Sequence, residues 1–187
     1  MKLKKNIVLI GMRGTGKTAI GKTLADFLKF DFIDIDHEIE TGEGVKIPKL
    51  VAQHDWKYFR DIESKYTAAI AKRKNTVIAT GGGVILRPKN ITALKKNGII
   101  VLIHSPLKHL TKRVARSSRP SLTGSNPTTE LADIWNERRE KYETAAHVTV
   151  KFNFETKNKK TDLIQKSKII LQTIHDIEKK HREKKLS

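Results

Sequence analysis

GMRGTGKT, the sequence of residues 11–18, matches the pattern G-x-x-x-x-G-K-[ST] of a phosphate-binding loop, or P-loop. Its glycines permit backbone turns with positive φ and let amide groups approach a polyphosphate closely. Lys17 carries a charge that reaches the β- and γ-phosphates, and the Thr18 hydroxyl is a ligand for Mg²⁺. An apolar run at 6–10 and a helical pattern at 17–29 flank the loop, as this motif requires. We therefore predict a nucleotide-phosphate site with Mg²⁺.

The length and composition are those of one α/β domain spanning residues 1–187, with 37% hydrophobic residues. The chain has no cysteine, which excludes a disulfide scaffold, thiolate zinc sites and cysteine nucleophiles. The basic start at 1–5 and the apolar run after it resemble a secretory signal, but the run is only about five residues long and leads into the P-loop. No segment approaches the roughly 20 apolar residues of a membrane span. We expect a cytoplasmic protein with no membrane partner.

The formal net charge of +18 has two interpretations. A nucleic-acid-binding protein carries such a charge with its basic residues gathered on one face. Here the lysines are spread along the chain, thicken only toward the C-terminus, and do not alternate with aromatic residues as in a stacking platform. We therefore favour a lysine-rich solvated surface and expect no specific nucleic-acid partner. We also expect a monomer.

Strands and helices alternate along the chain, which favours a parallel sheet with helical crossovers. Strands are predicted at 6–10, 31–36, 76–80, 98–104 and 147–152. Helices are predicted at 17–29, in a helical region at about 37–73 that contains a helix-turn-helix, and at 107–116, 130–142 and 162 to about 180. Residues 117–129 are rich in small and polar residues, so they are predicted to form an exposed loop.

Asp34 and Asp36 are the acidic residues expected at the end of a core strand. Typical P-loop enzymes place an aspartate there that holds Mg²⁺ through water, and the predicted strands at 76–80 and 98–104 end without one. Alternation along the strand predicts that both carboxylates lie on one side, at the edge where ligands of open α/β sheets bind. We predict Asp34 nearer the metal and Asp36 nearer the phosphoryl acceptor. Capping of the next helix, or simple salt bridges, stays open as an alternative.

Six motifs occur in an order and spacing that resemble those of the shikimate kinase family, from about residue 8 to residue 145. They are the P-loop, Asp34-Ile35-Asp36, Trp56-x-x-Phe59-Arg60-x-x-Glu63, Gly81-Gly82-Gly83, Arg119-Pro120 with Leu122, and Glu137-Arg138 before Tyr142. The resemblance implies an α/β, three-layer P-loop NTPase fold of the nucleoside-monophosphate-kinase type. Such a fold has a five-stranded parallel sheet in the order 2-3-1-4-5, a mobile lid and a substrate-binding helical insert. The resemblance also implies ATP-dependent phosphorylation of the 3-hydroxyl of shikimate, a step toward chorismate and the aromatic amino acids.

The same resemblance implies roles for the residues that match the family motifs. The residues implied to bind ATP are Gly14, Thr15, Gly16, Lys17, Thr18, Ala19 and, from a lid at about 117–129, Arg119. The residues implied to bind shikimate are Asp36, Arg60, Gly81, Gly82, Gly83 and Arg138. Mg²⁺ would be held by Thr18 and, through water, by Asp34. The catalytic residues would be Lys17, Asp36 and Arg119.

The chain departs from the family pattern in the lid, in the loop after the last strand and at the C-terminus. Ser121 stands where many bacterial members have an apolar residue, and 155–157 match poorly, so the adenine contacts stay open. A basic helix at about 162–187 extends beyond the usual end. Arg60 and Arg138 suit any carboxylate, which leaves a kinase of another polyol acid, of the gluconate type, as an alternative. A nucleic-acid-associated NTPase is a second alternative.

Overall fold

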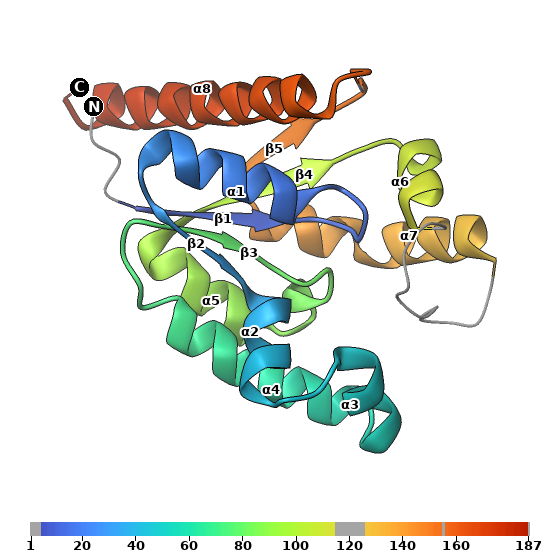
Figure 1. Ribbon diagram of the computed structural model, residues 1–187. Helices are drawn as coiled ribbons and strands as arrows, with labels where there is room; N and C mark the ends of the chain where they lie inside the picture. The colour runs from blue at the N-terminus through green and yellow to red at the C-terminus, as the bar shows by residue number, and fades with distance from the viewer. Residues whose placement is uncertain (1–4, 115–125, 155, 187) are drawn as a thin grey trace.

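Five parallel strands form the central sheet of the computed structural model, in the order β2-β3-β1-β4-β5 (Figure 1). The structure describes residues 5–114, 126–154 and 156–186. The strands are β1 (Asn6–Ile10), β2 (Asp31–Asp34), β3 (Thr76–Ala79), β4 (Gly98–His104) and β5 (Val148–Lys151). All neighbouring pairs run parallel. The predicted sheet and strand order are confirmed, and the carboxyl ends of the five strands lie at one edge.

Helices cover both faces of the sheet, and each face has its own hydrophobic core. α1 (Lys17–Leu28) and α8 (Lys159–Leu186) pack on the side of β1 that carries Ile7 and Leu9. The opposite side of β1, with Val8 and Ile10, faces the remaining helices. These are α2 (Ile35–Gly42), α3 (Ile47–Gln53), α4 (Trp56–Ile70), α5 (Pro88–Asn97), α6 (Leu107–Val114) and α7 (Pro127–Ala145). Alternating side chains of buried strands thus build three layers.

The P-loop joins β1 to α1 through glycines with positive φ. The φ angles of Gly11, Gly14 and Gly16 are 141°, 82° and 88°, which residues with a side chain rarely adopt. At Gly11 a Cβ would also collide with the carbonyl oxygen of Ile103 in β4. The tight turn lets α1 begin at Lys17, with its first amide groups open toward the carboxyl edge of the sheet.

The second strand is shorter than predicted, and Asp36 does not lie on it. β2 ends at Asp34, whose carboxylate caps α2 by accepting a hydrogen bond from the Asp36 amide, with 3.1 Å between Oδ1 and N. The alternating pattern at 31–36 favours a strand, but this capping bond ends it after Asp34. The prediction that both carboxylates project from one strand is therefore wrong, and the capping alternative holds for Asp34.

Helix α5 is absent from the sequence prediction, and α7 and α8 are longer than predicted. α5 begins at Pro88, whose fixed φ suits a first helical turn. α7 begins at Pro127 and is capped by Asn126, so residues 127–129 belong to this helix and not to the predicted loop. Residues 115–125, which hold the rest of that loop, lie outside the described residues. None of the described helices is long and apolar enough to cross a membrane.

The buried Asn6 side chain ties the start of β1 to the start of β3. Its Nδ2 donates to the Arg73 carbonyl at 2.7 Å, and its Oδ1 accepts from the Thr76 amide at 3.1 Å. We predict that Asn6→Ala lowers the free energy of unfolding by about 1–3 kcal/mol, because two backbone groups lose the buried Asn6 side chain as their partner. Urea denaturation measures the change. Asn153→Ala, at an exposed position, is the control and should shift the value by less than about 0.5 kcal/mol.

Candidate active site

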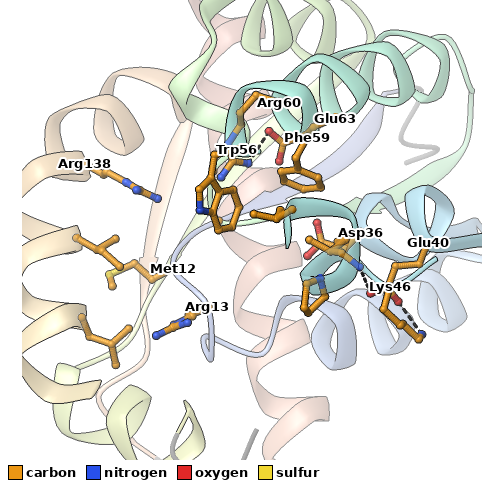
Figure 2. Close-up of a pocket in the computed structure, with 18 of the residues that line it drawn as sticks. Met12, Arg13, Asp36, Glu40, Lys46, Trp56, Phe59, Arg60, Glu63 and Arg138 are labelled. Carbon is orange, nitrogen blue, oxygen red and sulfur yellow. Dashed lines mark hydrogen bonds and ion pairs between the residues drawn. The ribbon is translucent and has the colours of Figure 1, made fainter. Parts of the chain in front are cut away.

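A cavity of about 740 Å³ opens at the carboxyl edge of the sheet (Figure 2). Its wall combines the P-loop, the start of α2, helices α3 and α4, the glycine run after β3, and α7. The predicted acceptor residues all line it, namely Asp36, Arg60, Gly81, Gly82, Gly83 and Arg138. The fold therefore brings together side chains from segments far apart in the sequence.

The loop backbone holds the Lys17 ammonium group inside the P-loop. Its Nζ donates to the carbonyl oxygens of Gly11 and Met12 at 2.8 and 2.9 Å. The Thr15 hydroxyl donates to the same Met12 carbonyl at 2.8 Å. These bonds wrap the loop around a positive charge beside the open amide end of α1, and such an arrangement binds anions such as phosphate.

Arg113 is a second cation at the P-loop, and sequence reasoning missed it. Arg113 lies on α6, and its Nη1 donates to the Gly14 carbonyl at 2.8 Å. The one sequence signal was the basic pattern at 107–116, which does not say which basic residue turns inward. The P-loop is thus contacted by a cation from α6 as well as by its own Lys17.

Thr18 at the end of the P-loop and Asp34 at the end of β2 form a hydrogen-bonded pair of oxygen-bearing side chains. The Thr18 hydroxyl donates to Asp34 Oδ2 at 2.6 Å. Among the described residues, no group of three or more His, Cys, Asp or Glu side chains could hold a metal ion. Mg²⁺ in phosphate sites takes one or two protein oxygens and completes its shell with water and phosphate. The pair therefore fits Mg²⁺ bound together with a nucleotide.

Arg60 is held rigidly on the acceptor side of the cavity. Its Nη1 donates to Glu63 Oε2 at 2.8 Å, one helical turn along α4. Its guanidinium carbon lies 5.3 Å from the ring centroid of Trp56 and 4.9 Å from that of Phe59. An ion pair and aromatic faces together leave the guanidinium little freedom. Trp56 and Phe59 also line the cavity.

Arg138 faces the cavity, whereas its neighbour Arg139 faces solvent. The Arg138 side chain is 13% exposed, and that of Arg139 is 62% exposed and paired with Glu143 at 2.9 Å. Successive helical residues point about 100° apart, so only one of the two can turn inward. Arg138, the residue that the family motif selects, is the one that lines the cavity, and its contact with shikimate stays a prediction.

The glycine run after β3 lies in close contact with its neighbours. A Cβ on Gly81 would lie 2.5 Å from Asp36 Oδ1, and one on Gly83 would overlap the Arg60 guanidinium. The Tyr142 hydroxyl donates to the Gly82 carbonyl at 2.5 Å and fixes the loop from the side of α7. Burial raises the pKa of Tyr142, so its hydroxyl remains a donor at neutral pH. Close approach thus requires glycine at positions 81 and 83, whereas a Cβ at Gly82 would make ordinary contacts.

Glu63 is a buried carboxylate next to the acceptor residues. Its Oε1 has no hydrogen-bond partner. This oxygen and Asp36 Oδ1 both lie close to Gly81, because a Cβ on that glycine would be 3.1 Å from the first and 2.5 Å from the second. Burial raises the pKa of Glu63; Arg60 opposes this shift, and the negative charge of Asp36 adds to it. The wall between Arg60 and Asp36 therefore holds a carboxyl group that keeps its proton more readily than usual.

Some predicted site residues lie outside the described part of the chain. Arg119 and most of the predicted lid fall within 115–125, and Glu155 is also outside. The sequence left open whether residues 155–157 contact adenine. Thr156 of this loop is described, and its amide donates a hydrogen bond to Asp162 Oδ1 at 3.2 Å. Arg13, which sequence reasoning did not single out, lines the cavity.

The chain is similar to known shikimate kinases in sequence and in structure. The shikimate kinase family model matches residues 13–177. The shikimate kinase of Thermodesulfovibrio yellowstonii is 41% identical over 142 residues, which cover 75% of this chain and 82% of that protein. Shikimate kinase from Acinetobacter baumannii, solved in complex with shikimate, has a TM-score of 0.86 and 34% identity, covering 94% of this chain and 95% of that one. The enzyme from Bacteroides thetaiotaomicron has a TM-score of 0.83 and 25% identity, covering 92% and 99%.

The raised pKa of Glu63 leads to a prediction about stability and pH. Below its unfolded pKa of about 4.3, Glu63 is protonated in both the folded and the unfolded state. As pH rises through the raised folded pKa, the wild type loses the stability that the protonated group contributes. Glu63→Gln has no such group, so its free energy of unfolding relative to wild type should rise between pH 4.5 and neutral pH.

Chemical denaturation at several pH values measures this difference. Glu143→Gln, the same change at an exposed ion pair, is the control and should shift the free energy of unfolding by less than about 1 kcal/mol. A constant difference between Glu63→Gln and wild type across the range would contradict the buried-carboxyl interpretation.

Proposed function

Because the chain belongs to the shikimate kinase family, we propose that ATP and shikimate bind on adjoining sides of the carboxyl edge of the sheet. The chain is an enzyme that phosphorylates the 3-hydroxyl of shikimate with ATP, giving shikimate 3-phosphate and ADP, on the route to chorismate and the aromatic amino acids. The observation that supports this arrangement is that a P-loop and two arginines, Arg60 and Arg138, meet at one cavity.

The ATP side is proposed to consist of the P-loop and the start of α1, residues 14–19. Backbone amides there and the Lys17 ammonium would hold the β- and γ-phosphates. Thr18 would be a direct ligand of Mg²⁺, and Asp34 would hold the ion through water, in line with their 2.6 Å hydrogen bond. When bound, Mg²⁺ neutralises charge on the phosphates. From the sequence, we also propose that Arg119 contacts the transferring group.

The acceptor side is proposed to hold shikimate by its carboxylate and its hydroxyls. Arg60 and Arg138 would grip the carboxylate, because the planar guanidinium offers paired N–H donors that match two carboxylate oxygens. The backbone of Gly81–Gly83, placed by Tyr142, would contact the ring closely, since no Cβ stands in the way. These contacts orient the ring so that one hydroxyl faces the P-loop.

Asp36 is proposed to bind and polarise the attacking hydroxyl. Its carboxylate lines the cavity in the first turn of α2, two residues from the Asp34 cap that faces Thr18. In the transfer, the hydroxyl oxygen forms a bond to the γ-phosphorus and its proton passes to Asp36. The bond from that phosphorus to the bridging oxygen breaks, and the electron pair leaves with ADP. Such transfers depend on alignment and charge compensation more than on covalent help.

The family membership does not favour a gluconate-type acceptor. A coupled ADP-release assay with shikimate, gluconate or neither as acceptor tests the function directly. We expect shikimate-dependent release that needs no nucleic acid. The single-domain organisation, the monomeric state, the cytoplasmic location and the lack of a specific nucleic-acid partner stay predictions from the sequence.

Replacing either cavity arginine by lysine should weaken shikimate binding strongly. Arg60→Lys and Arg138→Lys keep the charge but lose the paired donors, and losing one partner of a desolvated charge pair costs on the order of 2–5 kcal/mol, about a 30- to 4,000-fold loss of affinity. Calorimetric titration with shikimate measures it, and ATP affinity should stay nearly intact. Arg139→Lys is the matched control on the solvent side of α7. Wild-type shikimate affinity in both cavity variants would disprove the proposed carboxylate grip.

Asp36→Asn should lower turnover more than shikimate affinity. The amide keeps the shape and one acceptor oxygen but loses the charge that polarises the attacking hydroxyl. We expect kcat to fall by about 100-fold or more, the usual size of a general-base contribution, with a much smaller change in the shikimate dissociation constant. Steady-state rates together with calorimetry separate the two effects. Equal losses in rate and affinity would indicate a binding role alone.

A further inference from the structure

Arg13 occupies a variable position of the P-loop, but its side chain belongs to the acceptor cavity. Its backbone lies between Met12 and Gly14, where phosphates of the nucleotide are expected. Its side chain lines the cavity together with Arg60 and Arg138. Figure 2 shows these three arginines on different sides of the same space. The proposed carboxylate grip uses Arg60 and Arg138, and it leaves Arg13 without a function.

A buried carboxylate holds the Arg13 side chain in place. Glu130, in the first turn of α7, is fully buried and forms an ion pair with Arg13 Nη2. The Arg13 side chain itself is 12% exposed. A guanidinium positioned in advance loses little freedom when it binds an anion, which favours a tight and directional contact. The ion pair therefore presents Arg13 to the cavity as an ordered cation.

The Arg13 backbone lies where the P-loop meets the glycine run. A Cβ on Gly82 would lie 3.5 Å from the Arg13 amide nitrogen and 3.7 Å from the Gly11 carbonyl oxygen. A phosphoryl group that moves from ATP in the P-loop to a hydroxyl in the cavity has to cross this junction. The Lys17 ammonium donates hydrogen bonds to carbonyls within the P-loop. The Arg13 side chain, in contrast, lines the cavity in which the acceptor is proposed to bind.

We propose that Arg13 binds the transferred phosphoryl group on the acceptor side and holds the phosphate of shikimate 3-phosphate. The proposal rests on the function given above. When the γ-phosphorus exchanges its bond to ADP for one to the acceptor oxygen, a phosphate of about −1.5 to −2 charge forms in the cavity. Asp36 lies in the same wall and repels it. A cation at Arg13 offsets that repulsion as the charge arrives.

A purely structural role for Arg13 makes a different prediction. If Arg13 only neutralised Glu130, its loss would disturb the cavity wall and weaken the binding of shikimate and shikimate 3-phosphate alike. A contact with the phosphoryl group instead affects turnover and the phosphorylated product, and leaves shikimate itself bound. The comparison of the two ligands on the same variant separates the roles.

The experiment uses four variants of the full chain. Arg13→Gln removes the cation, and Glu130→Gln removes its partner while keeping Arg13. The double variant Arg13→Gln/Glu130→Gln avoids a buried carboxylate without a partner, so it keeps the test valid if the single Arg13 variant unfolds. Arg139→Gln, the same change at an exposed ion pair of α7, is the matched control. For each, kcat is measured at saturating ATP, and calorimetry gives the dissociation constants of shikimate and shikimate 3-phosphate.

The expected result is selective. Arg13→Gln and the double variant should lose about 100-fold in kcat, the usual effect of removing one charge-stabilising donor. Their affinity for shikimate 3-phosphate should fall about 30-fold or more, while shikimate affinity changes by less than about threefold. Glu130→Gln should retain most of the product affinity, because the Arg13 cation remains. Arg139→Gln should match wild type within about twofold.

Three outcomes would overturn the proposal. The first is wild-type affinity for shikimate 3-phosphate in the double variant. The second is an equal loss of affinity for shikimate and for shikimate 3-phosphate in that variant. The third is a set of losses in Glu130→Gln as large as those in Arg13→Gln. The acceptor itself is checked separately with the wild type. If the wild type fails to release ADP with shikimate, the function is wrong; if it turns over and the Arg13 variants are unaffected, only the role of Arg13 fails.

Discussion

The parallel pairing of β1 with β3 is the constraint on which the site depends. Leu9 pairs with Ala79 at the end of β3. The next residue, the buried Thr80, donates hydrogen bonds from its amide and its hydroxyl to the Leu9 carbonyl, at 3.2 and 3.0 Å. The loops that follow the two strands therefore begin at the same position along the strand direction, side by side at the carboxyl edge of the sheet. One is the P-loop and the other is the glycine run, so this register sets the phosphate-binding backbone beside the acceptor-binding backbone.

Buried glutamates then position the arginines that face the space between these loops. Glu63 pairs with Arg60, Glu130 pairs with Arg13, and both carboxylates are fully buried. A buried ion pair gains little stability over an apolar replacement, because both charges lose their water. What the pairs provide here is orientation, since each carboxylate anchors a guanidinium that lines the cavity. The molecule thus holds its acceptor cations in place before a ligand arrives.

The sequence was most informative where chemistry dictates both residue type and spacing. The P-loop, the inward-facing Arg138 and the sheet order were predicted, the last through the family resemblance. Asp36 was predicted to line the acceptor side, but from a strand that in fact ends at Asp34. The alternating pattern at 31–36 favours a strand, and it competes there with the local capping signal of Asp34, which the sequence analysis leaves open as an alternative. Arg113 was missed because facing directions within a basic helix depend on packing.

The apolar part of the cavity wall favours the binding of a cyclic hydroxy acid over that of a linear polyol acid. Trp56 and Phe59 form part of its wall, and Leu131 and Ile134 of α7 line it as well. A cyclic acid can lay an apolar ring face on such a wall and direct its hydroxyls toward Asp36 and the glycine run. A linear polyol acid carries a hydroxyl on nearly every carbon, so some would be desolvated against apolar side chains without a partner. Such unpaired polar groups cost about 1–3 kcal/mol each, which is enough for the cavity to discriminate between two acids that the arginines alone would accept equally.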